Sequence, residues 1–174
     1  MNITNFSDAF GVLMINEGKF TLNPKDPGNW STGRINEGIL DGTMWGISCR
    51  VAHENGYKGS MKYLPRETAE LIAKKHYWDP LHLDHLDSEV AFQVLDANYH
   101  GGSAAKWLQR ACGVEEDGVI GSKTLASANA CDKRFIMMRF NAYRIKYLVS
   151  CKIFPDFGKG WMNRIAANLL EGAD

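Results

Sequence analysis

The amino-acid sequence predicts one mainly α-helical domain, residues 1–174, with a small β-hairpin lobe after its first helix. Across most of the chain, apolar residues recur at the three- and four-residue spacing of an amphipathic helix. One segment, residues 19–47, lacks this periodicity and contains five glycines and two prolines, which are typical of turns and short strands. A chain of 174 residues, 45% of them hydrophobic, is long enough to bury one core.

The first helix is expected over residues 4–17, where apolar side chains fall on one face, and Gly18 ends it. In the segment that follows, the short stretches 19–22 and 30–35 are the candidates for the two strands of the hairpin. The lobe is therefore expected directly after the first helix.

Seven further helices are expected after the hairpin. Ser48 is a suitable N-cap for the first of them, and Gly56 ends it. Pro155 and the glycines that follow it are expected to break the chain before the last. The expected ranges are 48–55, 66–78, 88–99, 103–111, from 122 onward, 132–151 and 161–170.

Composition and charge exclude several classes of protein. The chain has 20 Lys and Arg residues and 20 Asp and Glu residues, so its formal net charge is 0. This balance argues against an acidic disordered chain and against a nucleic-acid partner. No apolar run approaches the roughly 18 residues of a membrane span. Residues 1–16 also lack the basic start of a signal peptide, so we expect a protein that begins in the cytoplasm.

Local charge differs from the overall balance. Residues 133–164 contain eight basic side chains and one acidic side chain, a net charge of 8 − 1 = +7. These charges are either the solvated faces of two helices or a surface that attracts anionic wall or outer-membrane polymers.

The cysteines are widely spaced and include no CxxC pair, which argues against a zinc ribbon and a thioredoxin-type site. We expect free thiols in a protein made in a reducing compartment.

Cys49 lies four residues before His53 in an expected helix, so the two side chains share a face. A Cys/His amidase is therefore an alternative function. No oxyanion-hole signature accompanies them. We expect no cofactor and no metal site. The four thiols are Cys49, Cys112, Cys131 and Cys151.

The end of the first helix carries a candidate general acid. Glu17 lies four residues after Leu13 and seven after Phe10, so it continues the apolar face. Apolar surroundings and the negative end of the helix both disfavour the charged carboxylate. The sequence therefore predicts a raised pKa for Glu17, which suits a general acid. The alternative is an ordinary carboxylate that points into solvent.

A second carboxylate follows at a suitable distance. Eight residues separate Glu17 from Asp26, enough for an extended arm that returns and places the two across a groove. Pro27 and Gly28 fix a sharp turn beside Asp26. Two carboxyl groups across a groove, one in apolar surroundings and one in a polar loop, are the arrangement that hydrolyses glycosidic bonds. Thr32, after five further residues, can share a water with Asp26.

These residues resemble a known family. The spacing of Glu17, Asp26 and Thr32 is similar to the catalytic triad of the phage-type lysozymes. A closer resemblance, to the endolysin-type N-acetylmuramidases of glycoside hydrolase family 108, lies in the stretches NEGKFTLNPKDPGNWSTG and GTMWGIS. The family's C-terminal half, usually described as a peptidoglycan-binding region, is similar to the stretches VLDANYHGGSAAKWLQRACGV, DGVIGSKTLAS and FGKGWMNRI.

The resemblance implies a lysozyme-like fold, with the catalytic motifs in residues 1–86 and a peptidoglycan-binding helical half in residues 87–174. It implies cleavage of the β-1,4 bond between N-acetylmuramic acid and N-acetylglucosamine in bacterial peptidoglycan. Glu17 is then the general acid, and Asp26 and Thr32 position the attacking water. It also implies that the protein reaches the wall from the host cytoplasm after release, in a holin-dependent manner. A monomer is the default expectation.

The sequence departs from the family in the loop after the second carboxylate. The pair 29–30 and an insertion at 31–41 interrupt the usual Gly-Gly-x-Thr run, so Thr43 competes with Thr32 as the partner of the water. Asp96 resembles a helix aspartate of the family, and we interpret it as structural. The other candidates for sugar binding also suit core positions, and they are Trp30, Trp45, Asn98, Tyr99 and His100.

Two other functions remain as alternatives. A lytic transglycosylase of the same fold type uses one glutamate and no water-positioning aspartate, and it leaves 1,6-anhydro ends. A non-catalytic wall-binding protein is compatible with the departure near Asn29 and with a second one at Lys19-Phe20, where the family tends to have Gly-Tyr.

Overall fold

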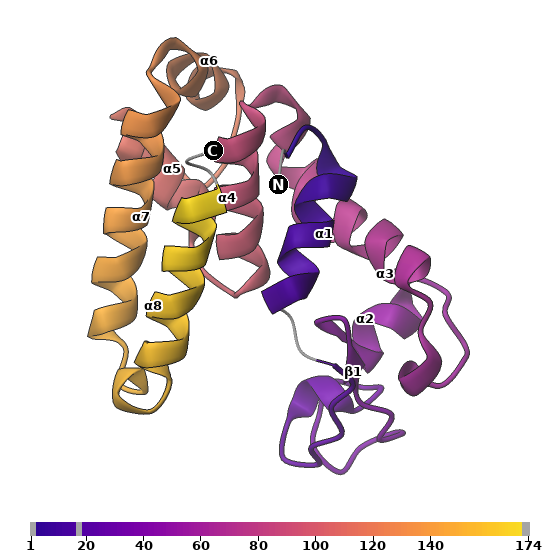
Figure 1. Cartoon of the computed structure of the whole chain (residues 1–174). Helices are drawn as coiled ribbons and strands as arrows, with labels where there is room; N and C mark the ends of the chain where they lie inside the picture. Colours follow the sequence, from indigo (N-terminus) through magenta and orange to yellow (C-terminus); the bar gives the residue numbers. More distant parts are fainter. Residues whose placement is uncertain (1–2, 17–18, 172–174) are drawn as a thin grey trace. The chain divides into compact units, whose positions relative to one another are not determined.

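The computed structural model describes residues 3–16 and 19–171, which fold into two compact units (Figure 1). One unit comprises Met1–Ala9 and Tyr77–Asp174, and the other comprises Phe10–His76. Helices dominate the described residues, which confirms the expected mainly α fold with a small β element. Within these residues, no helix has both the length and the apolar character needed to cross a membrane.

The first helix, α1 (Phe6–Asn16), lies within the predicted range 4–17 and begins with a reciprocal cap. Its predicted end at Glu17 and Gly18 lies outside the described residues. The side chain of Asn5 accepts the N–H of Asp8 at 3.1 Å, and the Asp8 carboxylate accepts the N–H and the hydroxyl of Thr4 at 3.0 and 2.7 Å. The Thr4 hydrogen bonds hold the pKa of Asp8 below its ordinary value. Phe10 and Leu13 on the apolar face are fully buried.

The unit Phe10–His76 has little regular structure. After α1, its strands and helices are β1 (Thr43–Met44), β2 (Ile47–Ser48), α2 (Cys49–Glu54) and α3 (Arg66–Ala73), with 3-10 turns at Pro27–Asn29 and Met61–Tyr63. A π-helical turn, Lys74–Trp78, follows α3 and ends in the other unit. The strands pair antiparallel, with Thr43 opposite Ser48 and Met44 opposite Ile47. As predicted, the Ser48 side chain caps α2 by accepting the N–H of Val51.

The hairpin lies later in the sequence than predicted. The stretches 19–22 and 30–35 are not its strands, because Thr21 and Trp30 each form only a single bridge, to Thr43 and to Leu40. The strands are instead joined by Trp45 and Gly46, whose φ angles are 56° and 73°. Positive φ at both central residues is what a tight hairpin turn requires. Tryptophan rarely adopts this conformation, so the sequence does not signal the turn.

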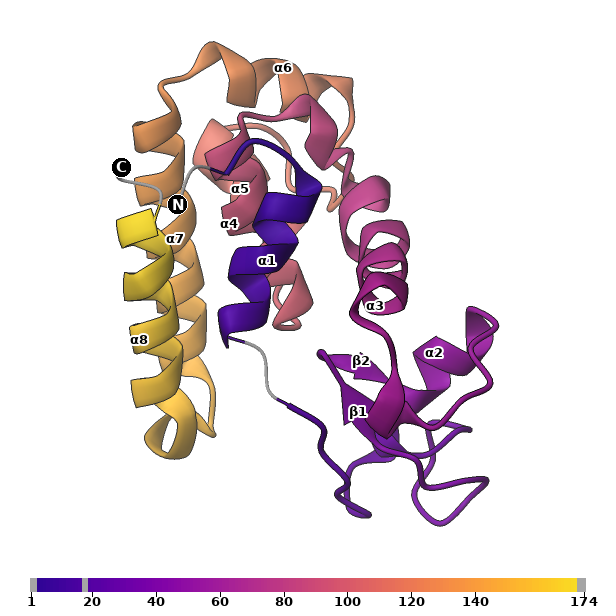
Figure 2. The ribbon, with the colours of Figure 1, turned by 45° about the vertical axis from the view of Figure 1, so that its right-hand side comes forward.

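The other unit is a set of packed helices. They are α4 (Ser88–Tyr99), α5 (Ala104–Cys112), α6 (Ser122–Ala130), α7 (Lys133–Ser150) and α8 (Phe154–Glu171), preceded by 3-10 turns at Asp79–Leu81 and Leu83–His85. Figures 1 and 2 both show α7 and α8 side by side. The ring of Trp107 on α5 packs against Phe140 and Tyr147 of α7, with centroid distances of 6.1 and 5.3 Å.

The last helix begins seven residues earlier than the predicted start at residue 161. Pro155 lies in its first turn, where a missing N–H costs nothing because the N–H groups there have no intrahelical acceptor. Gly158 within the helix leaves room for the ring of Phe154, which would lie 2.7 Å from a Cβ atom at this position. The residues interpreted as breakers are therefore accommodated inside α8.

A buried ionic cluster joins α4, α7 and α8. Asp96 on α4 is 0% exposed, and its carboxylate lies 2.8 Å from Arg144 of α7 and 2.8 Å from Arg164 of α8. Burial lowers the pKa of Arg144, and the charge of Asp96 opposes that shift. The cluster supports the structural interpretation of Asp96.

Candidate functional site

Asp26 is built into a tight turn. Its side chain caps the turn Pro27–Asn29, with Oδ1 accepting the N–H of Gly28 at 2.8 Å. The residue itself is exposed. The turn therefore fixes the direction of the carboxylate and leaves it accessible to water, as expected for the member of the pair in a polar loop.

Close packing holds this turn against the hairpin. A Cβ atom at Gly28 would lie 3.2 Å from Oδ1 of Asp26 and 3.5 Å from Cβ of Ser48 on β2. Ser48 pairs across the hairpin with Thr43. Because glycine lets the turn approach Ser48 so closely, the carboxylate of Asp26 is positioned relative to the strand pair that carries Thr43.

Asn29 connects the turn to β1 and was missed by the sequence analysis as a positioning residue. It is 0% exposed, its Nδ2 donates to the carbonyl of Asn23 at 3.1 Å, and its Oδ1 accepts the hydroxyl of Thr43 at 2.7 Å. Its carbonyl accepts the N–H groups of Asp41 and Gly42 at 3.0 and 3.1 Å. An asparagine in a polar, glycine-rich stretch gives no sequence signal of burial. The one sequence feature that singles out Asn29 is that residues 29–30 depart from the family pattern.

The two candidate threonines have different surroundings. Thr32 is exposed, and its hydroxyl donates to the carbonyl of Glu37 at 2.7 Å and accepts the N–H of Arg34 at 3.3 Å. Thr43 is half-buried on β1, and its hydroxyl donates to Asn29. Thr32 therefore closes a local loop, whereas Thr43 belongs to the network that supports the Asp26 turn.

The two tryptophans predicted to bind sugar are half-buried in this same unit. The indole N–H of Trp30 donates to the carbonyl of Pro24 at 2.9 Å, and that of Trp45 donates to the carbonyl of Leu64 at 3.0 Å. Because both N–H groups are bonded within the protein, sugar stacking would have to use the ring faces.

The remaining candidates for sugar binding lie at the end of α4 and are partly exposed. The ring of Tyr99 packs on Tyr77 with a centroid distance of 4.5 Å, and His100 lies 6.0 Å from Trp161. Burial, followed by the charges of Arg164 and Arg144, lowers the pKa of His100. Sugar binding by Asn98, Tyr99 and His100 stays a prediction.

Glu17, the predicted general acid, lies outside the described residues. Its role and its raised pKa stay predictions.

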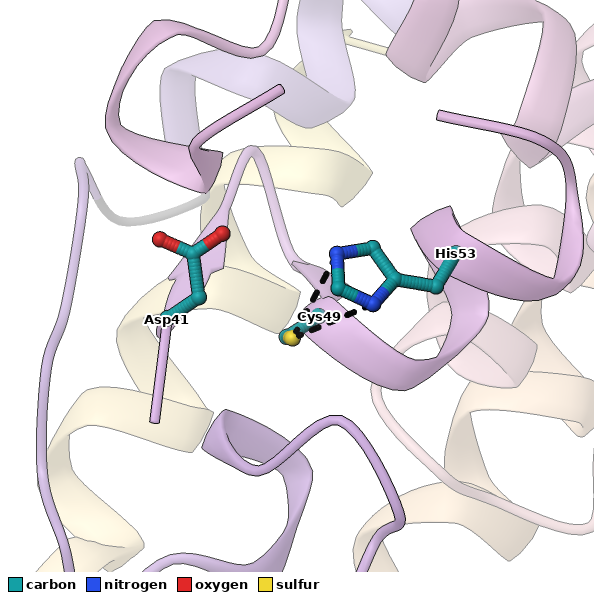
Figure 3. Close-up of side chains that lie close together, drawn as sticks. All are labelled: Asp41, Cys49 and His53. Carbon is teal, nitrogen blue, oxygen red and sulfur yellow. Dashed lines mark hydrogen bonds between the residues drawn. The ribbon is translucent and has the colours of Figure 1, made fainter. Parts of the chain in front are cut away.

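The cysteines are free thiols, as expected, and one of them lies in a cluster of possible metal ligands. Cys49 and His53 share a face of α2, with Sγ 4.0 Å from each ring nitrogen, and Asp41 lies beside them (Figure 3). Cys49 is 0% exposed, and burial followed by the charge of Asp41 raises the pKa of its thiol. A buried, protonated thiol is a poor nucleophile, which disfavours the Cys/His amidase.

The expected positive surface at residues 133–164 is reduced by internal ion pairs. Arg144 and Arg164 bind Asp96, and Lys133 lies 2.8 Å from Glu89. The basic residues of this stretch that are exposed are Arg134, Lys146, Lys152 and Lys159. An electrostatic contact with anionic polymers would therefore depend on these four.

Comparison with known proteins confirms the family resemblance. The family model described as glycosyl hydrolase 108 matches residues 10–102, more than half of the 174 residues, and a model described as a predicted peptidoglycan domain matches residues 103–166. Among solved structures, one titled "Structure of Brucella abortus SagA" is 31% identical, covers 97% of this chain and 93% of its own, and has a TM-score of 0.78. No curated protein sequence matches the chain. The chain thus belongs to the glycosyl hydrolase 108 family, and it is a glycoside hydrolase that acts on peptidoglycan.

Proposed function

We propose that the protein is an N-acetylmuramidase, which hydrolyses the β-1,4 bond between N-acetylmuramic acid and N-acetylglucosamine. The observation that carries the proposal is the accessible carboxylate of Asp26, which is held by its own turn; that turn packs against the hairpin at Gly28. Asp26 follows Glu17 after eight intervening residues, a spacing similar to that of the catalytic residues of the phage-type lysozymes. Glycoside hydrolysis needs such a pair, with one protonated and one ionised member.

In this proposal Glu17 donates its proton to the glycosidic oxygen as the bond to the leaving sugar breaks. Asp26 remains ionised, offsets the positive charge that develops on the sugar ring and orients the water that attacks it. Direct attack by water inverts the anomeric carbon and requires the two carboxyls to be roughly 6.5–9.5 Å apart, whereas a nucleophilic Asp26 requires roughly 5–5.5 Å.

The contacts favour Thr43 over Thr32 as the partner of the attacking water. Thr43 shares a strand pair with Ser48, on which the Asp26 turn packs, and it donates its only proton to Asn29. Its oxygen lone pairs remain available to accept a hydrogen bond from a water. The hydroxyl of Thr32 both donates and accepts within its own loop.

Removing each hydroxyl in turn tests this assignment. Thr43→Val is expected to slow the release of soluble fragments from purified, dye-labelled peptidoglycan by about 10- to 100-fold, because the water loses its partner and the Asp26 turn loses a support. Thr32→Val is expected to stay within about twofold of the wild type, since it removes only a hydrogen bond on an exposed loop.

Thr43→Ser is the control for packing, because it keeps the hydroxyl that Asn29 accepts. It is expected to restore most of the rate. Loss of activity in Thr32→Val together with normal activity in Thr43→Val would reverse the assignment, and an inactive wild-type protein would contradict the proposed hydrolysis.

A further inference from the structure

We propose that Asp41, Cys49 and His53 form a binding site for one zinc ion, which links the segment before β1 to α2. One sulfur, one imidazole nitrogen and one carboxylate oxygen from these residues all lie within 4.8 Å of one another. Figure 3 shows the three side chains converging from two segments, with Asp41 from the chain before β1 and the other two from α2. The proposal does not depend on the hydrolase mechanism.

The spacing of the sulfur and nitrogen atoms is close to that in a tetrahedral zinc site. Zinc binds sulfur at roughly 2.3 Å and nitrogen at roughly 2.0 Å, which places the two ligand atoms roughly 3.5 Å apart. The Sγ of Cys49 lies 4.0 Å from both ring nitrogens of His53. A turn of the imidazole and a movement of about half an ångström therefore bring one nitrogen into a coordinating position.

The carboxylate of Asp41 is already oriented by hydrogen bonds. One oxygen accepts the hydroxyl of Ser60 at 3.0 Å, and the other accepts the N–H of Met61 at 3.0 Å. Each carboxylate oxygen has two acceptor sites, so each can still bind a metal. Partners of this kind fix the ligands of natural zinc sites.

Charge balance favours a divalent ion at this place. Cys49 is fully buried beside the carboxylate of Asp41. When Zn²⁺ binds, the thiol proton passes to solvent, and the thiolate and carboxylate together neutralise the two positive charges of the ion. A mixed sulfur, nitrogen and oxygen set suits zinc and does not suit magnesium or calcium. His53 is only half-buried, so a water can supply the fourth ligand.

Zinc at this site would stabilise the part of the molecule that holds Asp26. In the described part of the unit Phe10–His76, the sheet has two short strands, and small structures of this kind commonly rely on a metal or disulfide. The N–H of Asp41 donates to the carbonyl of Asn29 at 3.0 Å. Fixing Asp41 to α2 therefore also fixes the end of the Asp26 turn.

Metal binding by the whole 174-residue chain tests the proposal. Bound metal is first removed with a chelator, and the chelator is removed by dialysis. When zinc is then added, the wild type is expected to bind one zinc ion per chain, measured by inductively coupled plasma mass spectrometry. Cobalt(II), used as a spectroscopic probe, is expected to give a thiolate-to-cobalt charge-transfer band.

Ser60→Ala and His53→Gln are each expected to weaken zinc binding by at least about 10-fold. Cys151→Ser, which removes a thiol on the other unit, is the matched control and is expected to bind zinc normally.

The wild-type cobalt spectrum decides the question even where a variant folds poorly. A wild type that binds no zinc, a cobalt complex without a thiolate band, or equal binding by wild type and His53→Gln would each overturn the site. If the wild type does not hydrolyse peptidoglycan, the proposed function is contradicted, but the zinc proposal is not affected.

Discussion

Replacing Glu17 by Gln is expected to lower the rate of peptidoglycan hydrolysis by at least about 10², because general acid catalysis contributes roughly 10²- to 10⁴-fold and an amide has no acidic proton to give. Glutamine has nearly the same shape, so substrate binding should be retained. The rate is measured as the initial release of soluble fragments from purified peptidoglycan at saturating substrate.

Glu54→Gln is the matched control. Glu54 is an exposed residue on α2 that pairs with Arg50 at 3.0 Å, and such surface pairs contribute about 0.5 kcal/mol or less. This variant should hydrolyse at the wild-type rate. The wild-type rate should also fall as the pH rises through the pKa of the acid, since only the protonated form can donate. A Glu17→Gln protein as fast as the wild type would exclude Glu17 as the acid.

Replacing Asp96 by Asn is expected to destabilise the protein by about 3–5 kcal/mol. Asp96 is the carboxylate between Arg144 and Arg164, and Arg144 is only 1% exposed. Removing the negative charge leaves a buried guanidinium without a counter-charge, and water cannot compensate it there. The change is measured as the loss in free energy of unfolding in a denaturant titration.

A second variant separates the charge effect from a packing effect. Arg144→Met removes one of the two positive charges and leaves Asp96 paired with Arg164. Because this pair is neutral and methionine fills much of the space, the cost should be clearly smaller than that of Asp96→Asn. The opposite order would show that the cluster acts through the shape of Arg144 and not through charge balance.

The sequence predicted the helices whose signals are local. Ser48 before α2 accepts an N–H group of the first turn, and this cap was predicted. The cap at Asp132 before α7 was not predicted, although the helix was expected over 132–151. The start of α8 was placed wrongly because Pro155 and Gly158 were interpreted as helix breakers. The helix accepts Pro155 because this residue lies in the first turn, and it accepts Gly158 beside the ring of Phe154. The local sequence pattern reveals neither circumstance.

The candidate site shows the same division between local and distant information. The turn at Asp26 follows from Pro27 and Gly28 and was predicted. The hairpin was misplaced because the positive φ of Trp45 is imposed by the folded chain. The burial of Asn29 and the approach of Asp41 to Cys49 also arise from contacts between segments, so neither could be derived from spacing. The i, i+4 contact of Cys49 with His53 on one helix face was the only part of that cluster that the sequence indicated.

The identity of the new chain ends made by the wild-type enzyme tests the central claim most directly. Purified peptidoglycan is digested, the products are reduced with borohydride, and their ends are identified by mass spectrometry. If Asp26 directs water onto the muramic acid sugar, the ends are N-acetylmuramitol. Ends of 1,6-anhydro-N-acetylmuramic acid would show that no water attacks, and ends of N-acetylglucosaminitol would show that the other glycosidic bond is cut; either result would contradict the account.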